Sequence, residues 1–257
     1  MHNFTFNLQN DGLAFLTLSH QPVNALSQEF VSTLSELFDE IAADSQIKVL
    51  VISSSIKHFC AGADLKERSN LSIDETERVV SDIGNCFSKL EKLPFPTISA
   101  INGSALGGGL EISLCCDFRV AEDSAILGLP ETSLGIIPGA GGTQRLPRLI
   151  GLSKGKYWIF SARKFSAEEA FIDGVVDFLS PDGEVLETAI DLATELMENA
   201  PLALRASKEA ISKGMGISLE SGLKVEKEAY SITLNSEDRI EALKSFTQKR
   251  PPKWSGK

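Results

Sequence analysis

Residues 101–111 read Ile-Asn-Gly-Ser-Ala-Leu-Gly-Gly-Gly-Leu-Glu, and this glycine-rich stretch decides how the rest of the chain is interpreted. Residues 97–101 are typical of a buried strand, and residues 110–116 of an apolar helix. The glycines therefore form a strand-to-helix turn, where backbone N–H groups are accessible to a ligand oxygen. No Gly-Lys-Ser/Thr follows, which excludes a P-loop. Two interpretations remain, a tight turn or an oxygen-binding loop.

A second loop of small residues, 57–66, follows a predicted strand over residues 49–52 and reads Lys-His-Phe-Cys-Ala-Gly-Ala-Asp-Leu-Lys. Two such loops at the carboxyl ends of two strands can direct two backbone N–H groups at one oxygen. This is the layout of an oxyanion hole, where removing one donor cost about 2.7–4 kcal/mol in a well-studied protease. The two loops together predict a site that stabilises negative charge on a carbonyl oxygen.

Two glutamates follow loops built from glycine or proline. Glu111 ends the first stretch, and Glu131 lies in Leu129-Pro130-Glu131, ahead of a third glycine cluster, 139–142, which we expect to shape the pocket wall. Apolar surroundings raise the pKa of a carboxyl group, because desolvation disfavours its charged form. Two such groups in one pocket can divide acid and base roles, as the addition or removal of water requires. For Glu111 a second interpretation is open, since the helix macrodipole alone favours a carboxylate in a first turn.

Predicted strands and helices alternate along the first two thirds of the chain, and the remainder is almost entirely helical. A hairpin is expected over residues 4–18, a helix after Ser27, and a capping box opens a helix at Ser72. The alternation predicts an α/β fold with right-handed crossovers, and a coiled stack of ββα turns is conceivable. We expect a core domain over residues 1–198 and a helical C-terminal domain over residues 199–257.

Charge and composition exclude several classes of binding partner. The 257 residues carry a net charge of −10, which disfavours binding to phosphate backbones, so we expect no nucleic-acid partner. No secretory signal and no run of about 18 apolar residues is present, so we expect no membrane partner. The four cysteines and three histidines have no metal-binding or CxxC spacing, which predicts no metal and a reducing, cytoplasmic compartment.

The motifs together resemble the crotonase superfamily, the enoyl-CoA hydratase/isomerase family. The resemblance covers nearly the whole chain. Residues 146–148, 160–163 and 249–252 look most like its methylglutaconyl-CoA hydratase-like branch. The motifs that carry the resemblance are Phe-Cys-Ala-Gly-Ala-Asp-Leu-Lys-Glu at 59–67, the stretch 101–111, and residues 129–131 through 138–146.

The resemblance implies a crotonase-like spiral of ββα turns with a helical C-terminal trimerisation region, assembled as a homotrimer or a dimer of trimers. It implies a coenzyme A thioester as substrate and no separate cofactor. Ala63 and Gly108 match the two oxyanion-hole donors, and Glu111 and Glu131 match the two catalytic glutamates. The implied substrate-binding residues are Val23, Ala61, Asp64, Leu65, Lys66, Gly107, Pro130, Gly139, Tyr230 and Lys249, of which Tyr230 and Lys249 match positions that reach a neighbouring subunit's CoA.

The expected reaction is reversible hydration of a 2-enoyl thioester. We assign water activation to Glu111 and proton transfer at the α-carbon to Glu131. The alternatives are an enoyl-CoA isomerase or an acyl-CoA hydrolase on the same fold. An RNA-binding protein is disfavoured, because residues 28–44 carry five acidic residues and no lysine or arginine. Compared with many members of the family, residues 20–26 are shorter between the proline and the asparagine and lack the usual basic residue there, so the role of this loop in CoA binding stays open. The sequence also leaves the acyl group and the pathway open, between fatty acid β-oxidation and branched-chain amino acid breakdown.

Overall fold

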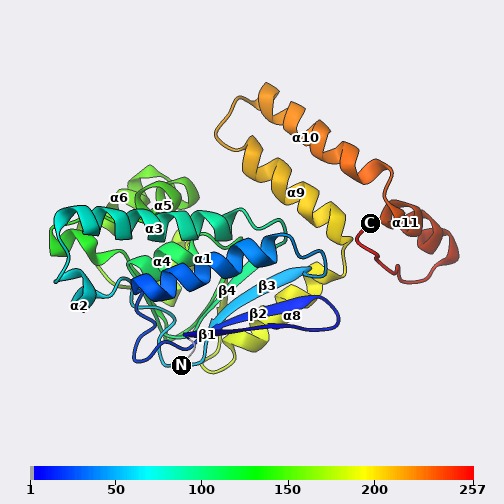
Figure 1. Cartoon of the computed structure of the whole chain (residues 1–257). Coiled ribbons are helices and arrows are strands. Elements are labelled where there is room, and N and C mark those ends of the chain that lie inside the picture. Colours follow the sequence, from blue (N-terminus) through cyan, green and yellow to red (C-terminus); the bar gives the residue numbers. More distant parts are fainter. Residues whose placement is uncertain (1–2) are drawn as a thin grey trace.

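A six-stranded sheet with the order β1-β2-β3-β4-β6-β9 lies at the centre of the computed structural model, which describes residues 3–257 (Figure 1). β1 and β2 are the predicted hairpin and pair antiparallel, whereas the following neighbours all pair parallel. The predicted α/β class is confirmed. The strands are β1 (Phe4–Leu8), β2 (Leu13–Leu18), β3 (Val49–Ser54), β4 (Thr97–Ile101), β6 (Phe118–Glu122) and β9 (Phe178–Ser180).

A second sheet of three short strands shows how the chain coils. It has the order β5-β7-β8, with β5 (Ser104–Leu106), β7 (Ile126–Gly128) and β8 (Phe165–Ser166). β4 and β5 are consecutive and lie in different sheets, and so are β6 and β7. Each such pair places one strand in each sheet, and equivalent strands of successive turns pair parallel. The chain is therefore a spiral of ββα turns, as expected.

The two faces of the large sheet bury different sets of side chains. α1 (Gln28–Ala42) and α3 (Ile73–Glu91) cover one face, where Leu50 and Ile52 join the main core (Figure 1). α8 (Val185–Met197) covers the other face against Val49 and Val51. Successive residues of a strand point to opposite faces, so β3 is apolar throughout because both faces are covered.

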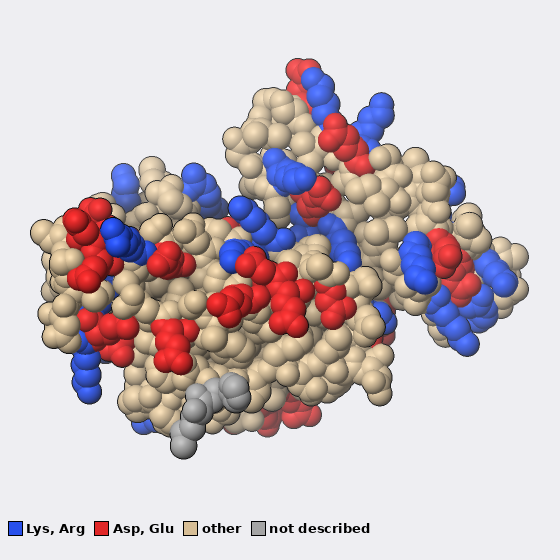
Figure 2. Space-filling model, viewed as in Figure 1, with Lys and Arg blue, Asp and Glu red and all other residues tan. Residues whose placement is uncertain are grey.

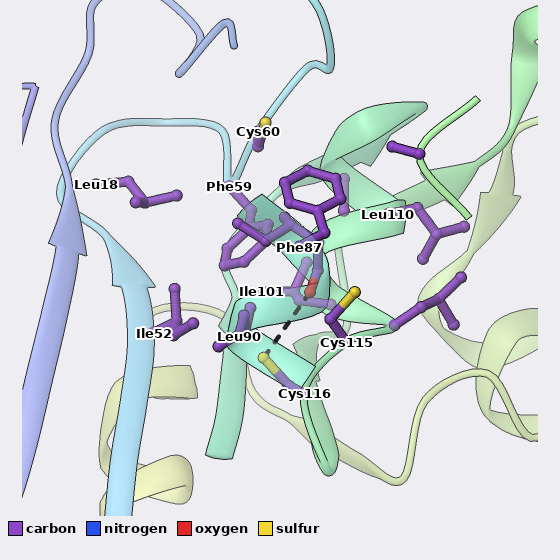
Figure 3. Close-up of a cluster of buried hydrophobic side chains, with 14 of the residues drawn as sticks. Leu18, Ile52, Phe59, Cys60, Phe87, Leu90, Ile101, Leu110, Cys115 and Cys116 are labelled. Atoms are coloured by element: carbon purple, nitrogen blue, oxygen red, sulfur yellow. Dashed lines mark hydrogen bonds between the residues drawn. The ribbon is translucent and has the colours of Figure 1, made fainter. Parts of the chain in front are cut away.

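The four cysteines lie in the hydrophobic core. Figure 3 shows Cys60, Cys115 and Cys116 among Phe59, Phe87 and Leu110, with the Cys116 Sγ directed at the carbonyl oxygen of Ile112, 3.9 Å away. All four cysteines are free and buried. Burial raises the pKa of the Cys60 thiol to about 12, so this thiol is neutral near pH 7.

Shorter elements connect the sheets to the site. Two expected features are present: Ser27 caps α1, and Ser72 and Glu75 form a capping box on α3. His2 lies outside the described residues, whereas His20 and His58 lie in loops. The connecting elements are α2 (Leu65–Arg68), α4 (Gly108–Ser113), the 3₁₀ helix η1 (Pro130–Leu134), α5 (Gly142–Ile150), α6 (Leu152–Ser161) and α7 (Ala167–Asp173).

Three helices at the C-terminus project from the core (Figure 1). α9 is attached to the core by polar contacts: Nη2 of Arg205 donates to the Ile47 carbonyl at 2.8 Å, and Nζ of Lys208 pairs with Asp117 at 2.7 Å. Many apolar side chains of the other two helices are exposed, including Phe246 at 86%. The three helices are α9 (Pro201–Gly214), α10 (Leu219–Leu234) and α11 (Glu237–Gln248).

The surface agrees with the acidic net charge. Acidic side chains gather around α1 on the face shown in Figure 2, and Glu29, Glu36, Asp39 and Glu40 of this helix are exposed. Between residues 3 and 257, no helix is long and apolar enough to cross a membrane. The same part of the chain contains no cluster of His, Cys, Asp and Glu that could hold a metal ion.

Candidate active site

The glycine-rich stretch makes a turn that only glycine adopts without strain. Gly107 has φ +53° and ψ −123°, outside the regions open to other residues, and its N–H donates to the Gly128 carbonyl at 2.9 Å. A Cβ on Gly107 would lie 3.0 Å from Oε1 of Glu131. The turn therefore brings the start of α4 against the second glutamate, which a side chain at this position would crowd.

Two backbone amides on different loops lie side by side. Isolated parallel bridges, Leu26 to Ala63 and Cys60 to Ala105, bind the second small-residue loop to its neighbours. A Cβ placed on Gly108 would lie 3.7 Å from the amide nitrogen of Ala63. Among the described residues, no acceptor is recorded for the N–H group of Ala63 or of Gly108. Two uncommitted donors thus lie close together, which is the geometry that an oxyanion requires.

Glu111 is held as a buried carboxylate by two amides of the third glycine cluster. Its Oε1 accepts the N–H of Ala140 at 2.9 Å and that of Gly142 at 2.8 Å, and its side chain is only 3% exposed. Desolvation raises the pKa of Glu111, while the two N–H groups and the nearby Arg145 counteract this effect. The glycine cluster therefore does more than shape the wall, because its amides fix one carboxylate oxygen.

Glu131 is also buried, but its carboxyl group has fewer hydrogen-bond partners than that of Glu111. It lies in the first turn of η1 behind Pro130, and its Oε2 has no hydrogen-bond partner. Burial is the main reason that its pKa is raised from the ordinary 4.5 to about 7, and the charge of Glu111 makes a smaller contribution in the same direction. A carboxyl group with this pKa exists in both protonation states near neutral pH, as proton transfer to and from carbon requires.

The carboxyl groups of Glu111 and Glu131 interact electrostatically, which indicates that they share one region of the structure. Glu111 acts on the pKa of Glu131, and the guanidinium of Arg68 lowers the pKa of both. Arg145 has a structural role as an ion-pair partner, because its Nη2 lies 2.7 Å from Oε2 of Glu91. A groove of about 710 Å³ between α1 and α3 contains neither glutamate.

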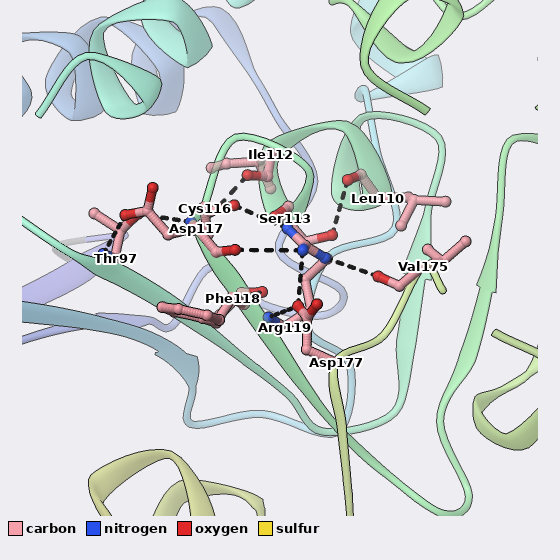
Figure 4. Close-up of polar contacts among 11 residues, drawn as sticks. Thr97, Leu110, Ile112, Ser113, Cys116, Asp117, Phe118, Arg119, Val175 and Asp177 are labelled. Atoms are coloured by element: carbon pink, nitrogen blue, oxygen red, sulfur yellow. Dashed lines mark hydrogen bonds and ion pairs between the residues drawn. The ribbon is translucent and has the colours of Figure 1, made fainter. Parts of the chain in front are cut away.

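A buried arginine fixes the helix that carries Glu111 (Figure 4). Arg119 Nη1 donates to the carbonyls of Cys116 at 2.8 Å and Ser113 at 3.5 Å, at the C-terminal end of α4. Its Nη2 pairs with Asp177 at 2.7 Å, and its Nε donates to the Val175 carbonyl at 2.7 Å. The charge is thus fully paired, and α4 is anchored to the chain that enters β9.

The short loop before α1 is organised by one asparagine. Asn24 is fully buried at φ +52°, and its Nδ2 donates to the carbonyls of His58 and Phe59 at 3.1 and 2.8 Å. Val23 accepts the N–H of Ala61 at 3.0 Å. This loop therefore supports the loop that presents the Ala63 amide.

The other predicted binding residues fall into two groups. Around the Ala63 loop, Ala61, Leu65 and Lys66 are exposed. Asp64 caps α2 by accepting the N–H groups of Lys66 and Glu67. Gly107, Pro130 and Gly139 lie on the loops that carry or face Glu131 and Glu111. Tyr230 on α10 and Lys249 after α11 are exposed on the projecting helices instead.

Sequence reasoning missed four residues that contribute to the site. The amides of Ala140 and Gly142 could have been suspected from the glycines at 139–142, because such runs leave N–H groups accessible. Arg119 gave one signal, a charge inside an apolar strand, where it requires a partner. Arg68 gave none, because a charged residue at the end of a short helix is usually solvated.

Comparisons with known proteins agree with this geometry. The family model described as enoyl-CoA hydratase/isomerase matches residues 9–257. The putative enoyl-CoA hydratase/isomerase YngF of Bacillus subtilis is 45% identical over 98% of this chain and 97% of its own length. A mitochondrial methylglutaconyl-CoA hydratase of Mus musculus is 43% identical over 96% of this chain and 81% of its own length.

Solved structures show the same fold. The crystal structure of an enoyl-CoA hydratase from Bacillus anthracis superimposes with a TM-score of 0.97 over the full length of both chains, at 42% identity. A model match over nearly the whole chain and relatives above 40% identity lead to one conclusion. The chain is an enzyme of the enoyl-CoA hydratase/isomerase family, the crotonase family.

Proposed function

We propose that this enzyme is a hydro-lyase that adds water reversibly across the 2,3 double bond of a 2-enoyl-CoA thioester. The observation that carries the proposal is the pairing of two buried carboxyl groups with two uncommitted amides. An isomerase needs one proton shuttle, whereas hydration needs one group for water and another for the α-carbon. The presence of both Glu111 and Glu131 in one region favours hydration.

The amides of Ala63 and Gly108 would receive the thioester oxygen. A 2-enoyl thioester is electrophilic at its β-carbon only if negative charge can collect on that oxygen. Two N–H groups with no other acceptor stabilise the enolate without reorganising when the charge develops. They are the source of the electrophilic activation in this mechanism.

The carboxyl groups divide the proton transfers. Glu111, whose Oε1 accepts two amide N–H groups, accepts a proton from water as the water oxygen bonds to the β-carbon. The electron pair of the double bond moves to the thioester oxygen. Glu131, protonated up to about pH 7, then delivers its proton to the α-carbon. The proton on Glu111 returns to Glu131 through solvent or a shared water, which restores the starting state.

We also propose that residues 199–257 form an assembly domain attached to a catalytic core of residues 1–198. Leu219, Leu223, Ile240, Leu243 and Phe246 of α10 and α11 are each more than half exposed, and apolar surface of this extent favours a protein partner. The proposed assembly is a homotrimer or a pair of trimers, in which Tyr230 and Lys249 approach a neighbour's CoA. Light scattering on the purified chain measures the state, and a monomer would contradict it.

The CoA portion would lie along the loop that carries Ala63, with Ala61, Leu65 and Lys66 exposed to it. The four neutral, buried thiols agree with a cytoplasmic location, which we retain as a prediction. CoA belongs to the substrate, and the mechanism requires no other cofactor.

Hydration is tested with crotonyl-CoA, by following loss of the conjugated enoyl absorbance. The same preparation is incubated with trans-3-hexenoyl-CoA, and the products are separated by mass and retention time. We expect rapid formation of 3-hydroxybutyryl-CoA and little isomerisation. Formation of 2-hexenoyl-CoA without hydration of crotonyl-CoA would identify an isomerase, and release of free CoA would identify a hydrolase.

The oxyanion hole is tested by Gly108→Ala. The new Cβ would lie 2.7 Å from the tip of the Leu26 side chain and 3.5 Å from the Cα of Gly62, and it would fill the space beside the Ala63 amide. We expect kcat for crotonyl-CoA to fall by about 10²-fold or more, because the new methyl group would keep the thioester oxygen away from the two donors. Gly84→Ala on α3 is the matched control, because its Cβ enters open space. Equal activity of the two variants would mean that the thioester oxygen does not use the space beside Gly108 and the Ala63 amide.

A further inference from the structure

The glycine cluster that holds Glu111 is held in turn by an arginine that has no part in the mechanism above. Arg145 lies near the start of α5, directly after residues 139–142. Its Nη1 donates to the Ala140 carbonyl at 3.0 Å, and its backbone N–H donates to the Gly141 carbonyl at 2.8 Å. One residue therefore contacts the cluster through both its side chain and its backbone.

These contacts orient three consecutive peptide groups. The first and the third supply the N–H groups of Ala140 and Gly142, which bind Oε1 of Glu111. The middle group joins Ala140 to Gly141, and its carbonyl accepts the hydrogen bond from Nη1 of Arg145. Fixing this group fixes ψ of Ala140 and φ of Gly141, two of the backbone torsions that separate the two amides.

The glycines make such a restraint necessary. Gly141 has φ +112°, and a Cβ on it would lie 1.9 Å from Nη1 of Arg145, so the guanidinium occupies the space of a side chain. The other glycines of the cluster also have no side chain that could fix the segment by packing. On its outer side the cluster lines a groove of about 420 Å³ between α3 and α5, so it is only partly packed against α3.

Glu91, the last residue of α3, holds the guanidinium from across this groove. Its two carboxylate oxygens accept hydrogen bonds from Nε and Nη2 of Arg145 at 3.0 and 2.7 Å. Two parallel hydrogen bonds set the plane of a guanidinium as well as its position. The pairing leaves Nη1 to the Ala140 carbonyl, so a continuous chain of contacts runs from α3 to the amides at Glu111.

We propose that Glu91 and Arg145 form a clamp that positions Glu111 for water activation through the amides of Ala140 and Gly142. Arg145 is a positioning residue, because its side-chain hydrogen bonds among the described residues go to Glu91 and Ala140 and not to Glu111. A displacement of about 1 Å in an active site can cost about 10²-fold in rate. The inference rests on the proposed hydratase function.

The first test measures hydration of crotonyl-CoA by Arg145→Met. We expect kcat to fall by about 10- to 100-fold while KM changes by less than about threefold, because the clamp acts on the base and not on substrate binding. Arg145→Lys keeps the charge without the planar fork and should give an intermediate kcat. Arg163→Met is the matched control, because Arg163 pairs with Glu169 at 3.0 Å and should leave kcat unchanged.

Glu91→Gln separates the clamp from a direct effect of charge on Glu111. A purely electrostatic role of the pair would shift the rate in the direction opposite to Arg145→Met, because the removed charge has the opposite sign. The clamp predicts a fall in kcat of about 3- to 10-fold, since the glutamine amide offers one acceptor oxygen instead of two. An unchanged or higher kcat would overturn the proposal.

A double-mutant cycle shows whether the clamp acts through Glu111. In Glu111→Gln no base remains to be positioned, so adding Arg145→Met should change the residual rate by less than about twofold. A general loosening of the fold would instead lower the rate by the same factor in both backgrounds. That result would contradict the proposal.

Hydrogen exchange separates this inference from the proposed function. We expect deuterium uptake at the Ala140 and Gly142 amides to accelerate by about tenfold or more in Arg145→Met and to stay unchanged in Arg163→Met. Faster exchange in a protein that does not hydrate crotonyl-CoA would contradict the function alone. Unchanged exchange in Arg145→Met, with hydration intact, would contradict the clamp alone.

Discussion

The two glutamates have similar sequence surroundings and different structural ones. Glu111 lies in the first turn of α4, a helix anchored at its other end by Arg119, and gives one oxygen to two amides. Glu131 lies in a 3₁₀ helix of five residues, and its Oε2 has no partner. Burial raises both pKa values, and at Glu111 the N–H groups of Ala140 and Gly142 oppose the rise.

The difference teaches how one pocket keeps a base and an acid at the same pH. Amide N–H groups favour the ionised form of Glu111, while an unpaired oxygen favours the protonated form of Glu131. The separation of roles would therefore arise from backbone donors rather than from residue type. The predictions below test this separation, starting from the largest effect.

Glu111→Gln should give the largest loss. The amide oxygen of glutamine can still accept the N–H groups of Ala140 and Gly142, so the loop stays in place, but no base remains for water. We expect kcat for hydration of crotonyl-CoA to fall by about 10³- to 10⁴-fold. Glu168→Gln, at an exposed position on α7, is the control. A loss below tenfold would assign water activation elsewhere.

Compared with Glu111→Gln, Glu131→Gln should lose less of the hydration rate and more of the proton exchange at the α-carbon. We expect a fall of about 10²- to 10³-fold in hydration, since solvent can replace a proton donor more easily than an oriented base. The discriminating measurement is deuterium exchange at the α-carbon of butyryl-CoA in D₂O. It should be abolished in Glu131→Gln and retained in Glu111→Gln. The reverse pattern would exchange the two roles.

Much of this comparison could be predicted from the sequence. Apolar periodicity and capping residues are local, so the hairpin, the capping box at Ser72 and the spiral architecture followed from them and from the family resemblance. Glu111 and Glu131 were singled out because a charge in an apolar stretch needs a reason. Their closeness to each other was a hypothesis that the fold now supports through Gly107, whose missing side chain leaves room for Glu131.

The features of the site that the sequence did not predict depend on contacts between segments far apart in the chain. Arg119 meets Asp177 from 58 residues away, and Ala140 reaches Glu111 across 29 residues. The Nε of Arg68 is buried without a hydrogen-bond partner, and no sequence pattern encodes such a missing contact. The projecting helices follow from amphipathic patterns, but the exposure of their apolar faces emerges only when the chain is folded.

The pH profile should reveal the acid. Hydration requires Glu131 protonated, so kcat/KM should decline about tenfold per pH unit above an apparent pKa of about 7. Arg68 lowers the pKa of Glu131, so Arg68→Met should shift this alkaline limb to higher pH. The profile is measured with trans-2-pentenoyl-CoA, which carries no acyl carboxylate. A limb that does not move, or moves to lower pH, would contradict the electrostatic link between the two residues.

The smallest effect concerns stability. The pKa of Glu131 is higher in the folded state than the value of 4.5 in the unfolded state. Below pH 4.5 the carboxyl group is protonated in both states, so it does not lower the free energy of unfolding there. Stability is then lost as pH rises from 4.5 to about 7, and the loss is constant above that. Glu131→Gln avoids it. We expect the variant to gain about 2–6 °C in Tm at pH 8 relative to pH 4.5, after subtraction of the unaltered enzyme at equal concentration.

Glu111→Gln provides the matched comparison in the same experiment. Its two amide hydrogen bonds partly offset the desolvation of the ionised carboxylate, so its removal should give a smaller pH-dependent gain. An equal gain in both variants would mean that the amides of Ala140 and Gly142 do not distinguish the two carboxyl groups. In that case the division into base and acid would have to arise from the bound substrate, whose thioester enolate forms closer to one carboxyl group than to the other.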